Sequence, residues 1–144
     1  MQQVFHVKTM EDWQPVVNAL VEHLSNHPKH RVVLLEGNLG AGKTTFVQLV
    51  MKRLGGNNLV QSPTFSLVNQ YTTADGKTVY HLDLYRLKDQ QELIEAGILD
   101  TVDGGAVCFI EWAALVEPFL DKDFTRVHIQ TGESGNRTVT LHCV

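Results

Sequence analysis

Short apolar segments alternate with polar, glycine-bearing connections along most of the chain. Residues 32–35 form an unbroken apolar run, which is typical of a strand buried on both faces of a parallel sheet. The predicted strand covers residues 31–36, and residues 106–110 form a second apolar run that predicts a buried strand. Buried strands that alternate with helical segments favour a layered α/β fold.

Two pairs of alternating segments predict antiparallel hairpins. Residues 66–71 and 78–84 flank a polar connection that contains Asp75-Gly76, a hairpin turn signal. Residues 125–131 and 138–144 flank a second polar connection. The sequence therefore predicts an α/β three-layer domain with a mostly parallel sheet and antiparallel edge strands. Its 144 residues are expected to form a single domain.

The chain is predicted to begin with a strand at residues 4–7 and a helix at residues 9–24. Thr9 to Asp12 have the spacing of a capping box, but Pro15 fits the helix better if Asp12 is the cap. The spacing of His23, His27 and His30 is nearly helical and could suggest a metal site. Pro28 is expected to end the helix before His30. We therefore expect a solvated helix end there rather than a metal site.

Two further helices are expected. Residues 45–54 follow the first buried strand and end at Gly55-Gly56, with basic residues in the last turn. Residues 89–99 form a short amphipathic segment whose apolar positions are Leu93, Ile94 and Ile98.

Composition narrows the classes of function. The chain has 12 basic and 16 acidic residues, a net charge of −4, and its basic residues are scattered. Independent binding of a nucleic-acid backbone depends on clustered Lys and Arg, so this class is disfavoured. No apolar run is long enough to cross a bilayer, and the first residues lack the features of a signal peptide. A cytoplasmic protein without a membrane partner is expected.

The segment from Gly37 to Thr44 has the spacing of a phosphate-binding P-loop. Its glycines allow backbone N–H groups to turn inward around a polyphosphate, and the helix that follows directs its positive end at the same anion. Lys43 is expected to contact the β- and γ-phosphates, and the Thr44 hydroxyl to bind Mg²⁺. The expected nucleotide-binding residues of the loop are Asn38, Leu39, Gly40, Ala41, Gly42, Lys43, Thr44 and Thr45.

Two acids are expected to lie near this loop. Glu111 follows a buried strand, the pattern of a Walker B acid that reaches Mg²⁺ directly or through water. Asp83 ends the neighbouring predicted strand and competes for the same role. One acid would hold Mg²⁺ while the other orients or deprotonates the attacking water. A salt bridge to Arg86 is the structural alternative for Asp83.

Three further residues are candidates for the site. Thr64 follows a proline in the connection after the P-loop helix, where P-loop hydrolases carry a switch segment, and an ordinary turn is the alternative. The chain has no guanine-reading signature, so ATP is the expected nucleotide. Thr9 and Arg137 are candidates for contacts to its adenine base.

Several motifs occur together in one order, and they resemble the TsaE (YjeE) family of small bacterial P-loop ATPases. The likeness covers about residues 31–115. The motifs are the P-loop through Phe46, Ser62-Pro63-Thr64-Phe65-Ser66-Leu67-Val68, Tyr80-His81-Leu82-Asp83-Leu84-Tyr85-Arg86-Leu87, Glu92-Leu93, Gly97-Ile98 and Ile110-Glu111-Trp112. The chain departs from the family pattern at Ala113, where proline is frequent.

The resemblance implies a Mg²⁺-dependent ATPase that takes part in making threonylcarbamoyladenosine on tRNA. It implies partner subunits like TsaD and TsaB that transfer the threonylcarbamoyl group, with tRNA held by that complex. By position in the motifs, Lys43 and Thr44 would be the phosphate and Mg²⁺ residues, and Glu111 a second Mg²⁺ ligand. Asp83 would be the acid needed for hydrolysis, and Thr64 a switch residue.

Two alternatives remain open from the sequence. A small-molecule kinase would need an acceptor pocket and usually an arginine-bearing lid, and its ATP turnover would rise with a metabolite. A scaffold that binds but does not hydrolyse the nucleotide would form its complex without turnover.

Overall fold

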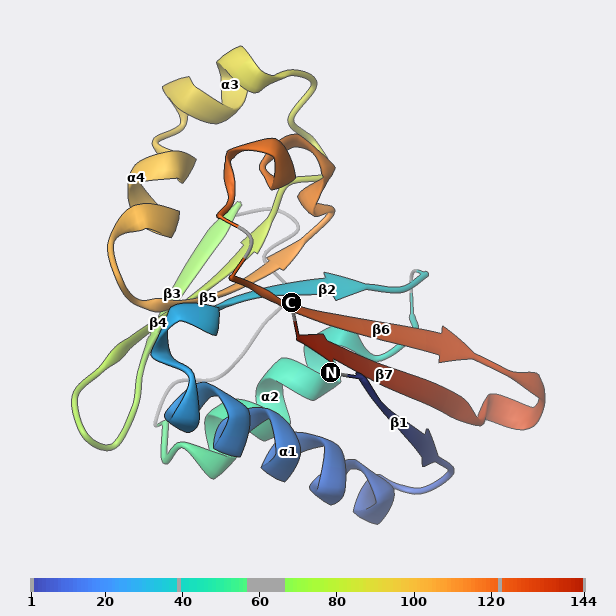
Figure 1. The fold of residues 1–144 in the computed structure, drawn as a ribbon. Helices are drawn as coiled ribbons and strands as arrows, with labels where there is room; N and C mark the ends of the chain where they lie inside the picture. Colours follow the sequence, from blue (N-terminus) through green and yellow to red (C-terminus); the bar gives the residue numbers. More distant parts are fainter. Residues whose placement is uncertain (1, 39, 57–66, 122, 144) are drawn as a thin grey trace.

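In the part of the chain that the structure describes, seven strands form one sheet in the order β1-β7-β6-β2-β5-β4-β3 (Figure 1). The computed structural model describes residues 2–38, 40–56, 67–121 and 123–143. The four central strands β6, β2, β5 and β4 are parallel, and β1, β7 and β3 add antiparallel edges. The strands are β1 (Gln2–Val7), β2 (Val32–Glu36), β3 (Val68–Thr72), β4 (Thr78–Asp83), β5 (Val107–Glu111), β6 (Thr125–Thr131) and β7 (Arg137–Cys143). The predicted α/β fold and both predicted hairpins are confirmed.

Helices cover both faces of the sheet, which gives three layers (Figure 1). The α-helices are α1 (Trp13–Asn26), α2 (Lys43–Arg53), α3 (Gln90–Glu95) and α4 (Ile98–Asp103). Short 3₁₀ helices lie at Met10–Asp12, Pro28–His30, Ala113–Leu115, Glu117–Phe119 and Glu133–Gly135.

The apolar run of β2 is buried on both faces because a core lies on each side of the sheet. Val33 and Leu35 belong to the core under α1 and α2, whereas Leu34 belongs to the core under α3 and α4. Successive side chains of a strand point to opposite faces, so a strand between two helix layers needs apolar residues at every position. All four parallel strands end at the same edge, and the loop from β2 to α2 lies there.

Local signals explain most helix boundaries. Asp12 is the N-cap residue of α1, and Pro15 therefore lies in the first turn, where a proline is tolerated. The prediction of one helix over residues 89–99 was wrong. The chain forms α3 and α4 instead, and Gly97 between them has a left-handed φ of 74° that interrupts the helix.

Three histidines gather at the end of α1, and the expected solvated helix end was wrong for one of them. His23 is buried, and its Nε2 lies 2.8 Å from Nδ1 of His30. The rings of His23, His27 and His30 stack with centroids 4.4 to 5.2 Å apart. Among the described side chains, no group of three or more His, Cys, Asp and Glu is placed to hold a metal ion.

The free energy of unfolding is expected to fall as the pH drops below about 6.5, the ordinary pKa of His. Burial lowers the pKa of His23, and repulsion from His27 and His30 lowers it further. A depressed folded-state pKa means that the unfolded chain binds the proton first, so protonation favours unfolding. Urea unfolding of His23→Gln between pH 7.5 and 5 should show a shallower pH dependence, with the exposed His6→Gln as control. Equal slopes for wild type and His23→Gln would contradict this expectation.

In the described part of the chain, no helix is both long and apolar enough to cross a membrane.

Candidate functional site

The connection from β2 to α2 forms a glycine-rich loop at the carboxyl edge of the parallel strands. Gly40 and Gly42 have φ values of 79° and 113°, a left-handed backbone that glycine adopts without strain. A Cβ added to Gly37 would lie 2.8 Å from the carbonyl oxygen of Ile129 in β6. Glycine is therefore required at Gly37 for the loop to pack against the neighbouring strand.

Helix α2 begins directly after this loop. Gly42 is its N-cap residue and has no side chain that could cap the first turn. The first N–H groups of an α-helix lack intrahelical partners and form the positive end of its dipole. Thr44 and Thr45 lie half-buried in this turn and add two hydroxyl groups. This end of the helix is suited to bind an anion.

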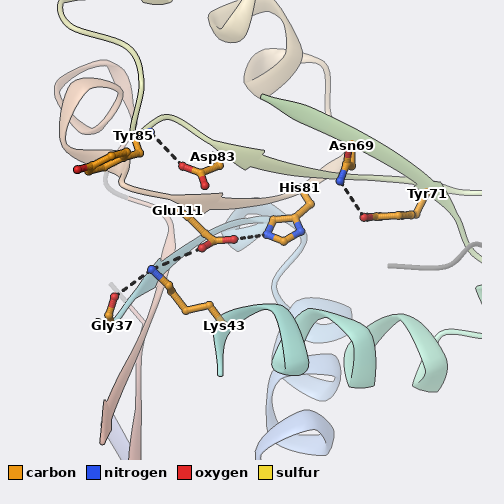
Figure 2. A network of polar contacts seen from close by, with 8 residues as sticks. All are labelled: Gly37, Lys43, Asn69, Tyr71, His81, Asp83, Tyr85 and Glu111. Atoms are coloured by element: carbon orange, nitrogen blue, oxygen red, sulfur yellow. Dashed lines mark hydrogen bonds and ion pairs between the residues drawn. The ribbon is translucent and has the colours of Figure 1, made fainter. Parts of the chain in front are cut away.

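Lys43 links the two ends of the loop and faces the acid of β5. Only 7% of its surface is exposed, and its Nζ donates a 2.9 Å hydrogen bond to the carbonyl oxygen of Gly37. The same Nζ lies 3.5 Å from Oε1 of Glu111 and 5.0 Å from the ring centroid of Trp112. The predicted P-loop lysine and Walker B acid are thus brought together (Figure 2).

The parallel pairing of β4 and β5 places the two predicted acids side by side. Asp83 lies directly opposite Glu111 in the ladder. Both residues share the sheet face of Val79 and Phe109, which pack in the core under α1 and α2. On this face His81 follows Val79 in β4, and the two acids occupy the last positions, beside the P-loop.

Glu111 is an ionised carboxylate at neutral pH. Burial raises the pKa of this side chain, but a 2.6 Å hydrogen bond with His81 and the nearby charge of Lys43 outweigh burial, so the pKa is lowered overall. Because the carboxylate is ionised, the nitrogen of His81 that contacts it must donate the hydrogen bond.

Asp83 is almost completely buried, and its Oδ1 accepts a 3.0 Å hydrogen bond from the backbone N–H of Tyr85. This contact fixes the carboxylate at the end of β4, beside Glu111 (Figure 2). The carbonyl oxygen of Asn38 accepts a 3.0 Å hydrogen bond from the N–H of Ala41 within the loop. Two predicted site residues, Leu39 and Thr64, lie outside the described residues.

Arg137 contacts the P-loop from the edge of the sheet. Its Nε donates a 2.6 Å hydrogen bond to the carbonyl oxygen of Ala41, and a Cβ on Gly42 would lie 3.3 Å from the same nitrogen. Val7, the last residue of β1, pairs with Arg137. The exposed Thr9 comes two residues after Val7, so it also lies near Arg137. The backbone N–H of Thr9 donates to the carboxylate of Asp12. Both predicted adenine contacts therefore come from segments near the loop, with Arg137 touching it directly.

A cavity of about 560 Å³ opens beside the loop. Gly37, Asn38 and Lys43 line one side, and Arg126 lies on another. Two acids hold the Arg126 guanidinium, since Glu36 and Glu117 each lie 3.0 Å from one of its nitrogens. The Lys43 side of the cavity offers a cation and the loop backbone to a ligand.

These residues fit a nucleotide with a divalent cation. A Cβ added to Gly40 would meet no atom of the described residues within 4 Å, so the backbone at Gly40 is open to a ligand. The loop and the first turn of α2 carry donors suited to phosphate, namely Lys43, the N–H groups of the helix end and two hydroxyls. The carboxylates of Glu111 and Asp83 are the hard oxygen ligands that Mg²⁺ prefers, and Mg²⁺ in such sites also uses phosphate oxygens.

Comparison with known families agrees with this geometry. A family model described as "Threonylcarbamoyl adenosine biosynthesis protein TsaE" matches residues 7–139. The chain belongs to the TsaE family. The match runs from the last residue of β1 to the third residue of β7, so it covers the loop, both acids and Arg137.

Individual TsaE proteins match different shares of the chain. A Bacillus subtilis relative is 38% identical over 114 residues, which are 78% of this chain and 70% of that protein. A Haemophilus influenzae relative is 46% identical over 82 residues. These residues are 57% of this chain and 51% of that protein. A Treponema pallidum relative is 36% identical over 90% of both chains. All three are named tRNA threonylcarbamoyladenosine biosynthesis protein TsaE.

A solved structure shares the fold. The crystal structure of Bacillus subtilis YdiB superposes with a TM-score of 0.72 at 26% sequence identity. The superposition covers 100% of this chain and 86% of that chain.

Sequence reasoning missed His81, a residue that contacts the predicted site of this TsaE-family chain. His81 is fully buried and bonded to Glu111. A usable signal was present, because His81 is a polar residue at an inward position of a strand between Val79 and Asp83. Tyr85 was also missed, and its exposed ring lies 4.9 Å from that of Trp112 beside Lys43.

Proposed function

We propose that this chain binds and hydrolyses ATP with Mg²⁺, and that it thereby supports formation of the threonylcarbamoyl group on adenosine of tRNA. The observation that carries the ATP site is the buried pair of Lys43 and Glu111 beside an uncapped helix end. The proposed role in tRNA modification is supported by membership of the TsaE family, whose relatives are named for tRNA threonylcarbamoyladenosine biosynthesis.

The loop and Lys43 are proposed to bind the phosphates. Backbone N–H groups at the start of α2 would bind the phosphate oxygens, and the Nζ of Lys43 would contact the β- and γ-phosphates. This nitrogen is held between Gly37 and Glu111, so it is already directed at the loop. A cation fixed in this way loses less side-chain entropy when the anion binds.

Thr44 and Glu111 are the proposed protein ligands of Mg²⁺. When bound, the ion neutralises charge that develops on the phosphate oxygens. Asp83 is proposed to orient or deprotonate the attacking water, because it lies opposite Glu111 and its carboxylate is fixed by the N–H of Tyr85. Thr64 is proposed as a switch residue, and Arg137 and Thr9 as contacts on the adenine side of the site.

The proposed partners are transferase subunits like TsaD and TsaB. The expected result is slow ATP hydrolysis by the isolated chain and an increase of at least about tenfold when candidate partner subunits are added. Phosphate release should be measured for the chain alone, with the subunits, and with the subunits and tRNA. Equal rates in all mixtures would contradict activation by partners. Complex formation that requires ATP but shows no turnover would indicate a scaffold instead.

The isolated chain should bind tRNA weakly, with a dissociation constant above about 1 µM at physiological salt. Its net charge is −4, so few phosphate contacts can release counterions. Filter binding with labelled tRNA over a range of salt concentrations tests this, and an unrelated RNA of equal length is the control. Tight binding with a steep salt dependence would show that the chain contacts tRNA directly.

A further inference from the structure

His81 connects the core of the sheet to Glu111, the acid proposed to bind Mg²⁺. It lies in β4 opposite Phe109, and its Nε2 reaches diagonally to Oε2 of Glu111 at 2.6 Å. The other carboxylate oxygen, Oε1, faces Lys43 at 3.5 Å. Figure 2 shows these contacts as one line from Gly37 through Lys43 and Glu111 to His81. The two oxygens of Glu111 therefore have different partners, one in the sheet and one at the loop.

Packing alone does not account for a histidine at this position. His81 has no exposed surface, and Val79 and Phe109 on the same sheet face are apolar. Asn69 of β3 lies opposite His81 in the ladder, and its amide donates a hydrogen bond to the hydroxyl of Tyr71. The Nδ1 of His81 is buried without a hydrogen-bond partner among the described residues. An unpaired buried nitrogen destabilises a fold, and an aliphatic residue would fill the same space without that cost. The contact with Glu111 is the feature of this position that an aliphatic side chain cannot supply.

We propose that His81 is a positioning residue, whose Nε2–H holds one oxygen of Glu111 so that the other oxygen faces the P-loop. Glu111 ends β5, and without a second partner its carboxylate is free to rotate about its terminal bond. Lys43 could then engage both oxygens and compete with the nucleotide for the acid. His81 prevents this by occupying Oε2 from the side of the sheet. This inference rests on the proposed function, because it assigns a role to His81 through the acid that is proposed to bind Mg²⁺.

The test compares His81→Leu with His81→Gln. The leucine variant removes the donor, whereas the glutamine amide offers an N–H to the same oxygen. For His81→Leu we expect the turnover number to fall and the Mg²⁺ concentration for half-maximal nucleotide binding to rise, each by about 10- to 100-fold. Affinity for ATP without Mg²⁺ should stay within about threefold, because the phosphate-binding groups are intact. His81→Gln should recover most of the loss.

A second readout does not depend on activity. In protein labelled with ¹⁵N-histidine, the Nε2 proton of His81 should give a protected downfield resonance in the absence of nucleotide. The resonance should shift in Glu111→Gln and be absent from His81→Leu. Val79→Ala is the matched packing control, since it lies two residues away on the same strand and face. It should lower thermal stability without changing the dependence of binding on Mg²⁺.

The outcomes distinguish a failure of the positioning role of His81 from a failure of the proposed function. Wild-type protein that binds and hydrolyses ATP, together with a His81→Leu variant of unchanged Mg²⁺ dependence, would overturn the positioning role alone. Wild-type protein without any Mg²⁺-dependent nucleotide binding would overturn the proposed function and this inference with it. If His81→Gln restored none of the Mg²⁺ dependence lost in His81→Leu, or if Val79→Ala lost as much of it, the effect would be one of packing. Either result would also overturn the positioning role.

Discussion

ATP affinity of the Lys43→Ala variant is expected to fall by about 10- to 150-fold, with loss of measurable turnover. Charge-assisted hydrogen bonds contribute about 1.5–3 kcal/mol each, which corresponds to this range of dissociation constants. Lys43 is the cation that lies within the loop itself, as its bond to the carbonyl oxygen of Gly37 shows. Isothermal titration calorimetry with ATP, with and without Mg²⁺, measures the change.

Lys52→Ala is the matched control for this variant. Lys52 lies in the last turn of the same helix, α2, and its side chain is exposed. Its removal changes the net charge equally but should leave ATP affinity unaltered. Circular dichroism should accompany the titration, because Lys43→Ala also removes a bond that closes the loop. A folded Lys43→Ala protein with wild-type affinity and turnover would contradict the P-loop assignment.

Elements with strong local signals could be predicted from the sequence. The run from Val32 to Leu35 indicated a strand between two helix layers, and the structure buries it on both faces. Asp75-Gly76 marked the hairpin of β3 and β4 because an Asp-Gly pair suits a tight turn. These features depend on neighbouring residues alone, which is why one sequence is enough to recognise them.

The helical segment at residues 89–99 shows where periodicity is insufficient. Its apolar spacing fits one helix, yet Gly97 turns the chain and Ile94 is 56% exposed. Glycine permits both a helical and a left-handed backbone, and packing decides between them. Packing against the sheet favours a turn here, since Leu93 and Ile98 are then both buried in the same core.

The residues of the candidate site could be predicted from local motifs, but their contacts could not. Lys43, Glu111 and Asp83 could be proposed because each sits in a motif or at the end of a recognisable strand. That Lys43 and Glu111 lie 3.5 Å apart follows only from the pairing of β2 with β5. His81 was missed because its importance depends on register: Asp83 pairs with Glu111, which puts His81 diagonal to the acid. Strand register between distant segments is not written in either segment alone.

Glu111→Gln should lose most Mg²⁺-dependent turnover, with a fall of at least about 100-fold, while binding ATP without Mg²⁺ almost as well as wild type. The substitution keeps the size of the side chain and removes the charge proposed to bind the ion. The Nζ of Lys43 keeps its bond to the carbonyl oxygen of Gly37, so the phosphate-binding groups stay in place.

Asp83→Asn is the informative comparison, because Asp83 is the neighbouring buried acid on the same sheet face. If Asp83 acts on water, its variant should also lose turnover but should keep the gain in ATP affinity that Mg²⁺ gives wild type. Calorimetric titration of each variant with ATP, with Mg²⁺ and with EDTA, separates the two roles. Loss of the Mg²⁺-linked affinity in Asp83→Asn and its retention in Glu111→Gln would reverse the assignment. The paired ends of β4 and β5 would then still hold the two acids, but with the ion on the β4 side.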